Sequence, residues 1–168
     1  MRIISVDPGF GRMGVAVIEY ARGTKAPLVL YSTCVKTSPK DDFPLRLKAL
    51  GGALEKIIVA YAPVSLAIEK LFFSSNQKTA LSVAEARGVA VYEAARHGLS
   101  FFEYTPIQIK AAVAGYGRAD KQQVMLMVPR LVTFKDTAKK TKGAGLSDDE
   151  FDAIAVGITH IACLKFKI

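Results

Sequence analysis

The sequence lacks the features of a membrane protein and of a disulfide-rich secreted protein. It contains no apolar run of about 18 residues, so we expect no membrane-spanning helix. Met1 and Arg2 precede only a short apolar stretch, too short for the core of a signal peptide. The only cysteines are Cys34 and Cys163, each among apolar neighbours. We interpret both as free thiols in a reducing compartment, the cytoplasm, which excludes a disulfide framework and a zinc site.

Acidic residues are scarce relative to basic ones. The chain has 15 Asp and Glu against 23 Lys and Arg, which gives a net charge of +8. This balance favours a polyanionic partner such as nucleic acid, although basic proteins without one are common. The 168 residues show no internal repeat and suit one domain with a substantial core. We therefore expect a single domain over residues 1–168.

The apolar pattern predicts a mixed sheet. Strand-like segments lie at residues 2–7, 14–20, 28–36, 64–69 and 99–104, and helical spacing at residues 45–61 and 77–96. Three further helices begin at Thr105, Asp120 and Ser147, which are good N-caps. The first three strands are close in sequence, which predicts an antiparallel meander, and the later strands alternate with helices. The sequence therefore predicts an α/β fold with a five-stranded mixed sheet and helices on both faces.

Two of the buried strands end on an acid. Asp7 closes the strand at residues 2–7, and Glu69 closes the strand at residues 64–69. If these strands are parallel neighbours, both carboxylates emerge at the edge where open α/β sheets bind ligands. Taken singly, each acid is explained equally well by a turn or by a solvated strand end. Together they would repel each other unless a divalent cation such as Mg²⁺ lies between them.

The last helix supplies further acids in the segment "SDDEFDAIAVGITH". Asp148, Asp149 and Glu150 fall in its first turn, where the helix dipole alone accounts for them. Asp152 lies in the second turn among apolar residues and shares a helix face with Asp149 or with Asp148. An acid pair facing the two strand-end acids would form a cage for two metal ions about 4 Å apart, which clamp the attacking water and the leaving oxygen of a phosphodiester.

At this point several motifs are familiar. The segments "DPGFGRMG", "AIEKLFFSSN", "EARGVAVYEAA", "FEYTPIQIK", "AVAGYGRADKQQVMLMV" and "DAIAVGITH" together resemble the RuvC family of Holliday-junction resolvases, in order and over nearly the whole chain. The match is weakest at residues 132–147. The resemblance implies an RNase H-like fold, a homodimer and a divalent-metal-dependent endonuclease. Such an enzyme makes paired symmetric nicks in four-way DNA junctions during recombination and repair.

The resemblance also implies cofactors, partners and site residues. It implies two Mg²⁺ ions per active site, with Mn²⁺ as a substitute, and the RuvA–RuvB branch-migration complex as a further partner. The implied catalytic metal ligands are Asp7, Glu69, Asp149 and Asp152. The family motif has two alanines where this chain has Glu150 and Phe151, so Asp148 stays open as an alternative to Asp149.

A further set of residues matches family positions that contact DNA. These are Phe72, Phe73, Asn76, Lys110, Arg118 and Lys121. Lys121 is in addition expected to act in catalysis by offsetting charge in the transition state. Phe72 is the aligned aromatic, and a core role explains either phenylalanine equally well. A role in the dimer interface or packing against the sheet would equally explain the small residues Ala84, Gly88 and Ala95.

Other functional classes share parts of this pattern. Actin-like ATPases and sugar kinases also have a strand, an Asp and a glycine turn, but they need a duplicated domain and a second phosphate loop that a chain of this length lacks. A catalytically inactive DNA-binding protein gains nothing from four acids in a basic groove. The remaining alternative is an RNase H-like nuclease acting on another structured nucleic acid, and "AVAGYGRADKQQV" favours the resolvases.

Overall fold

The computed structural model describes residues 1–71, 77–135 and 145–165, and its centre is a six-stranded sheet of order β5-β4-β1-β2-β3-β6. The strands are β1 (Arg2–Asp7), β2 (Arg12–Glu19), β3 (Leu28–Lys36), β4 (Ser65–Glu69), β5 (Ser100–Tyr104) and β6 (Thr133–Phe134). The predicted meander is confirmed, because β2 pairs antiparallel with both β1 and β3. The predicted parallel neighbours are confirmed as well, since β4 pairs parallel with β1 and with β5.

The prediction of five strands was one short. The sixth strand, β6, has two residues and pairs parallel with the beginning of β3. A strand of two residues carries no periodicity, and only its pairing with β3 defines it.

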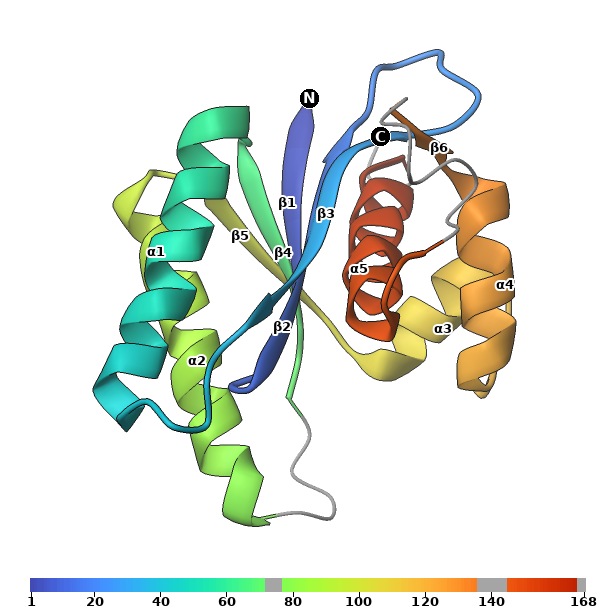
Figure 1. Ribbon diagram of the computed structural model, residues 1–168. Helices are drawn as coiled ribbons and strands as arrows, with labels where there is room; N and C mark the ends of the chain where they lie inside the picture. Colours follow the sequence, from blue (N-terminus) through green and yellow to red (C-terminus); the bar gives the residue numbers. More distant parts are fainter. Residues whose placement is uncertain (72–76, 136–144, 166–168) are drawn as a thin grey trace.

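In the part of the chain that the structure describes, five helices cover the two faces of the sheet. They are α1 (Phe43–Tyr61), α2 (Gln77–Arg96), α3 (Pro106–Ala114), α4 (Lys121–Leu131) and α5 (Asp148–Lys165). Helices α1 and α2 lie on one face, and α3, α4 and α5 lie on the other (Figure 1). Within the described chain, no helix is both long enough and apolar enough to cross a bilayer.

Strand β1 is mostly apolar because both of its faces are covered, and its one fully buried polar side chain, Ser5, donates a hydrogen bond to the carbonyl oxygen of Ala16. Ile4 and Val6 belong to the core under α1 and α2, and Ile3 belongs to the core under α5. Successive side chains of a strand point to opposite faces, so a central strand with helices on both sides needs apolar residues on both faces. The carboxylate of Asp7 comes at the end of the strand.

Helices α3, α4 and α5 begin where the sequence predicts them. Thr105 and Asp120 each accept a hydrogen bond from the backbone N–H three residues later, and Gln108 and Gln123 complete the two capping boxes. Ser147 does the same for α5 together with Glu150. These caps fix the first turn of each helix, and the first turns of α4 and α5 carry Lys121 and Asp149 of the site.

The buried His160 ties α5 to the sheet. Its Nδ1 is hydrogen-bonded to the Tyr104 hydroxyl at 2.7 Å and its Nε2 to the Ser65 hydroxyl at 3.2 Å. Both partners lie in strands, β5 and β4, so this histidine has a structural role.

Candidate active site

Asp7 lies at the centre of the acidic cluster. It is the last residue of β1 and pairs with Gly14 of β2. Burial, and then the negative charge of three nearby carboxylates, raise the pKa of Asp7 from 3.8 to about 8. Those carboxylates belong to Glu69, Asp152 and Asp149. The four acids predicted from the sequence therefore act on one another electrostatically at one edge of the sheet.

Glu69 reaches this edge through the parallel pairing of β4 with β1. Val6 is the partner of Ile68, so the next residue of each strand is an acid. Burial, followed by the charge of Asp152, raises the pKa of Glu69 from 4.5 to about 7, and Lys110 opposes this shift. The prediction that both strand-end acids emerge at the same edge is confirmed.

The N-terminal end of α5 comes close to Asp7 because residue 14 has no side chain. A Cβ atom on Gly14 would overlap the backbone carbonyl oxygen of Asp149. Since Gly14 is also the strand partner of Asp7, this close approach brings the first turn of α5 beside Asp7. Gly14 is therefore needed for the packing of α5 against β2.

Asp149 is held by two side chains that the sequence analysis did not identify. Arg12 donates two hydrogen bonds to its Oδ2, one of them from Nε at 2.9 Å, and Cys34 donates a third at 3.3 Å. Burial would raise the pKa of Asp149, but the bonds from Arg12 and Cys34 outweigh it and hold that pKa below its usual value. The expectation that Cys34 lies in apolar surroundings was therefore wrong.

Strand register explains why Arg12 and Cys34 meet at this acid. Cys34 pairs with Gly14, and Arg12 precedes Gly14 by two positions, so both side chains lie on the face of the sheet that Gly14 presents to α5. No motif marks either residue. The alternation of the meander strands, combined with the correct register, would have identified them.

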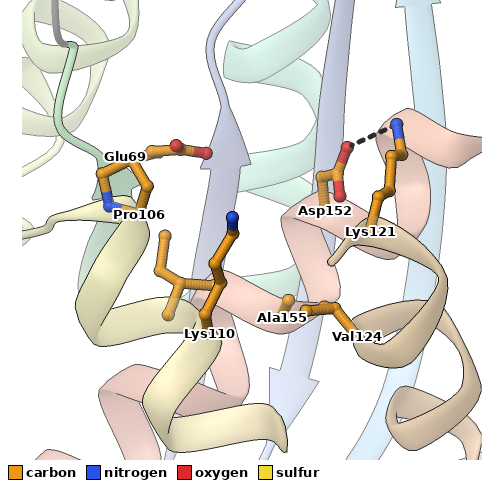
Figure 2. A pocket seen from close by; sticks show the side chains of 8 residues that line it. Glu69, Pro106, Lys110, Lys121, Val124, Asp152 and Ala155 are labelled. Carbon is orange, nitrogen blue, oxygen red and sulfur yellow. Dashed lines mark ion pairs between the residues drawn. The ribbon is translucent and has the colours of Figure 1, made fainter. Parts of the chain in front are cut away.

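Lys121 bridges two acids of α5. Its Nζ lies 3.3 Å from Asp152 and 3.2 Å from Asp148 (Figure 2 shows the pair with Asp152). Burial raises the pKa of Asp152, while Lys121 opposes that rise. The side chain of Asp148 is 61% exposed, against 20% for Asp149, and its charge is not among those that shift the pKa of Asp7. These facts favour Asp149 over Asp148 as the inner acid.

A cleft of about 210 Å³ opens beside these acids. Its lining residues are Glu69, Pro106, Ile109, Lys110, Lys121, Val124, Asp152 and Ala155. Glu69 lies on one side and Asp152 with Lys121 on the other, and Lys110 points up between them (Figure 2). Two carboxylates and two ammonium groups thus share one cleft. The ammonium groups are suited to attract an anionic substrate, and the carboxylates are suited to bind metal ions beside it.

The other predicted DNA contacts are less defined. Phe72, Phe73 and Asn76 lie outside the described residues. Arg118 is exposed on the turn between α3 and α4, and its contact with DNA stays a prediction.

The acids match the chemistry of a divalent-cation site. None of the ion pairs among the described residues includes Asp7 or Glu69, and burial, followed by the charge of neighbouring carboxylates, raises the pKa of each. Hard cations such as Mg²⁺ take carboxylate oxygens. Within residues 1–71, 77–135 and 145–165, no three acid, histidine or cysteine side chains are close enough to ligate one ion as they stand. Asp149 and Asp152 are instead turned to Arg12 and Lys121.

Comparison with known proteins agrees with this geometry. Residues 3–160 match the family described as "Crossover junction endodeoxyribonuclease RuvC". A relative of that name from Finegoldia magna is 40% identical over 167 residues, covering 99% of this chain and 96% of the relative. The structure of Thermus thermophilus RuvC has a TM-score of 0.86 at 27% identity, covering 99% of this chain and 97% of that one.

A second structure of the Thermus protein contains DNA. It is described as T. thermophilus RuvC in complex with Holliday junction substrate, and it has a TM-score of 0.87 at 28% identity, covering 99% of this chain and 96% of that one. These likenesses confirm the predicted α/β, RNase H-like architecture.

Proposed function

Because the chain belongs to the RuvC family of crossover junction endodeoxyribonucleases, we propose that it resolves four-way DNA junctions by hydrolysing phosphodiester bonds. One observation carries this proposal: the acids at the ends of β1 and β4 and those in the first turns of α5 act on one another at one sheet edge, beside a cleft with two lysines. Junction DNA is the substrate bound by the similar Thermus protein.

The metal ligands in this proposal are Asp7, Glu69, Asp149 and Asp152, and the cofactor is Mg²⁺, two ions per site, with Mn²⁺ as a substitute. When bound, such ions activate water and neutralise the charge that grows on the phosphate. Asp7 and Glu69 end neighbouring strands, so the sheet positions them rigidly. Asp149 and Asp152 lie on α5 and must exchange their basic partners for the ions.

Lys121 and Lys110 interact with the phosphate groups of the substrate in this proposal. Hydrolysis joins a water oxygen to phosphorus and breaks the bond to a sugar oxygen, which leaves with a proton. If Asp152 held a cation, Lys121 would keep the exposed Asp148 as its acid partner, and its ammonium group would be available to offset the phosphate charge at the reacting group. Lys110 already acts electrostatically on Glu69 across the cleft and is placed to hold a phosphate there.

A homodimer would supply the two active sites that paired nicks require. An exposed stripe along α2 supports this proposal, and its members are Leu81, Gly88, Tyr92 and Ala95. A Cβ on Gly88 would meet nothing within 4 Å, so packing against the sheet does not explain this glycine. Leu81 is 67% exposed and Tyr92 is 63% exposed. We propose that this α2 stripe packs against its copy in a second chain.

Action in the cytoplasm and docking of the RuvA–RuvB complex are further parts of the proposal. The two free cysteines support a reducing compartment, whereas the docking rests on the family resemblance alone.

A three-substrate assay tests the function. The protein is incubated in Mg²⁺ with a labelled four-way junction, the matching linear duplex and an RNA–DNA hybrid of the same sequence. We expect paired nicks in the junction and neither of the other substrates to be cut. Cleavage of the hybrid alone would support the alternative nuclease. A preparation of Asp7→Asn run in parallel shows whether any cleavage comes from a contaminant.

A further inference from the structure

Arg46 lies in the first turns of α1, beside the turn that follows Asp7. The start of α1 and the β1–β2 turn lie at the same edge of the sheet (Figure 1). The guanidinium carbon of Arg46 is 3.8 Å from the centre of the Phe10 ring. Its Nε donates a hydrogen bond of 3.0 Å to the Thr37 hydroxyl, which itself donates to the Phe10 carbonyl oxygen at 2.8 Å. The guanidinium is therefore held in place from two sides.

The surroundings of Phe10 make this arrangement rigid. Phe10 packs against Phe43 at the start of α1, with ring centres 5.0 Å apart. The backbone N–H of Thr37 donates to the carbonyl oxygen of Gly11 at 3.1 Å. Arg46 is thus fixed relative to the β1–β2 turn, and that turn begins at Asp7.

Arg46 differs from the paired arginines of the chain. The arginines that form ion pairs with acids are Arg2, Arg12, Arg87 and Arg96. None of the ion pairs among the described residues includes Arg46. A guanidinium that is already oriented, and that has no carboxylate partner, is suited to bind a phosphate, because its planar fork matches two phosphate oxygens and little side-chain freedom remains to be lost.

The position of Arg46 complements the two lysines of the cleft. Lys110 and Lys121 belong to α3 and α4, on one face of the sheet, whereas Arg46 belongs to α1, on the other face. The strand that ends on Asp7 lies between these layers. A DNA strand with its scissile phosphate at Asp7 would cross the sheet edge, and its neighbouring phosphates would meet basic side chains from both faces.

We propose that Arg46, stacked on Phe10 and anchored by Thr37, binds a DNA backbone phosphate on the side of Asp7 away from the cleft lysines. The inference rests on the proposed function, because it assumes that DNA is the substrate at Asp7. It adds a contact from a third helix, and it assigns a role to Phe10 and Thr37 as positioning residues.

Binding measurements at several salt concentrations test this site. Arg46→Gln and Arg46→Lys are made in the Asp7→Asn background, so that the junction stays uncut. The matched control is Arg22→Gln, an exposed arginine between β2 and β3, at the far end of these strands from Asp7. We expect Arg46→Gln to weaken junction binding about tenfold and to lower the slope of log K against log salt by about 1. Arg46→Lys should keep the slope and part of the affinity, and Arg22→Gln should change neither.

Two outcomes would overturn the inference. In one, Arg46→Gln binds the junction with the same affinity and slope as Arg22→Gln. In the other, it lowers the melting temperature but leaves the salt slope unchanged, which would mean that Arg46 only braces the β1–β2 turn. Both outcomes can be distinguished from the result that would contradict the proposed function. In that result, the unaltered protein leaves the junction uncut.

Discussion

When no cation is present, Asp7 and Glu69 bind and release their protons near neutral pH, well above the usual range of a carboxyl group. Their pKa values of about 8 and about 7 have burial as the first cause, and neighbouring carboxylates add to it. The fold tolerates the free-energy cost of burying these carboxylates close together at the place where the proposed metal ions need oxygen ligands. Replacing one of these acids should therefore affect stability and activity in opposite directions.

We predict that Asp7→Asn abolishes junction cleavage and stabilises the protein. The amide keeps the shape of the side chain but removes a buried charge, so in a chelator at pH 8 the free energy of unfolding should rise by about 1–2 kcal/mol. Gel assays and urea unfolding measure the two effects, and junction binding should persist. Asp148→Asn is the control, since that acid is largely exposed. If Asp148→Asn were equally inactive, Asp148 would replace Asp149 in the site.

The same shifts predict how stability depends on pH. The pKa values of Asp7 and Glu69 in the folded chain lie above their ordinary values of 3.8 and 4.5. The folded state therefore binds protons that the unfolded state has released, and this contribution is complete below about pH 4 and lost as pH rises to about 8. In chelator, urea unfolding should show the Asp7→Asn protein gaining stability over the unaltered one between pH 5 and pH 8. Parallel profiles for the two proteins would contradict the raised pKa of Asp7.

A site residue could be predicted from the sequence where the residue and its immediate neighbours are unusual by themselves. An acid at the end of an apolar strand, as at Asp7, is conspicuous because burial disfavours charge. Arg12 and Cys34 carry no such signal, since their meeting with Asp149 depends on strand register and on a helix packed against Gly14. That information is in the tertiary structure and not in any local pattern.

At the scale of elements, the packing of α5 against β2 controls the geometry of the site. We predict that Gly14→Ala destabilises the protein by about 3 kcal/mol and abolishes cleavage, because the added methyl group would push the first turn of α5 away from Asp7. Thermal unfolding and the junction assay measure both effects.

Gly52→Ala is the matched control for Gly14→Ala. Gly52 lies inside α1, and a Cβ there would meet nothing within 4 Å. Alanine should therefore raise stability by about 0.5–1 kcal/mol through helix propensity and leave cleavage unchanged. If Gly14→Ala behaved like Gly52→Ala, α5 would be free to shift without consequence.

The elements themselves were largely predictable. The strand at residues 28–36 and the helix at residues 77–96 have the bounds that their apolar periods indicate. The caps at Thr105 and Asp120 are local chemistry, so local sequence reveals them. Among the elements of the described residues, the two-residue β6 was missed, because pairing with a distant strand creates it.

At the scale of the whole molecule, the proposed paired nicks require the proposed homodimer. We predict that Leu81→Asp, in the α2 stripe, converts a dimer to a monomer and replaces paired nicks by single ones. Val59→Asp is the control, because Val59 of α1 is also 67% exposed and lies outside the stripe. Sedimentation measures the mass, and a supercoiled cruciform substrate separates nicked from linear product. A Leu81→Asp protein that stays dimeric would place the interface elsewhere.

Arg12 and Lys121 form ion pairs with Asp149 and Asp152. Their positive charges therefore take the place of the metal ions at these two acids. Removal of the metal should therefore leave the enzyme folded but inactive, and adding the metal back should restore activity without refolding. Such a protein can stay bound to a DNA junction without cutting it. Cleavage then depends on the supply of metal ions rather than on recognition of the junction.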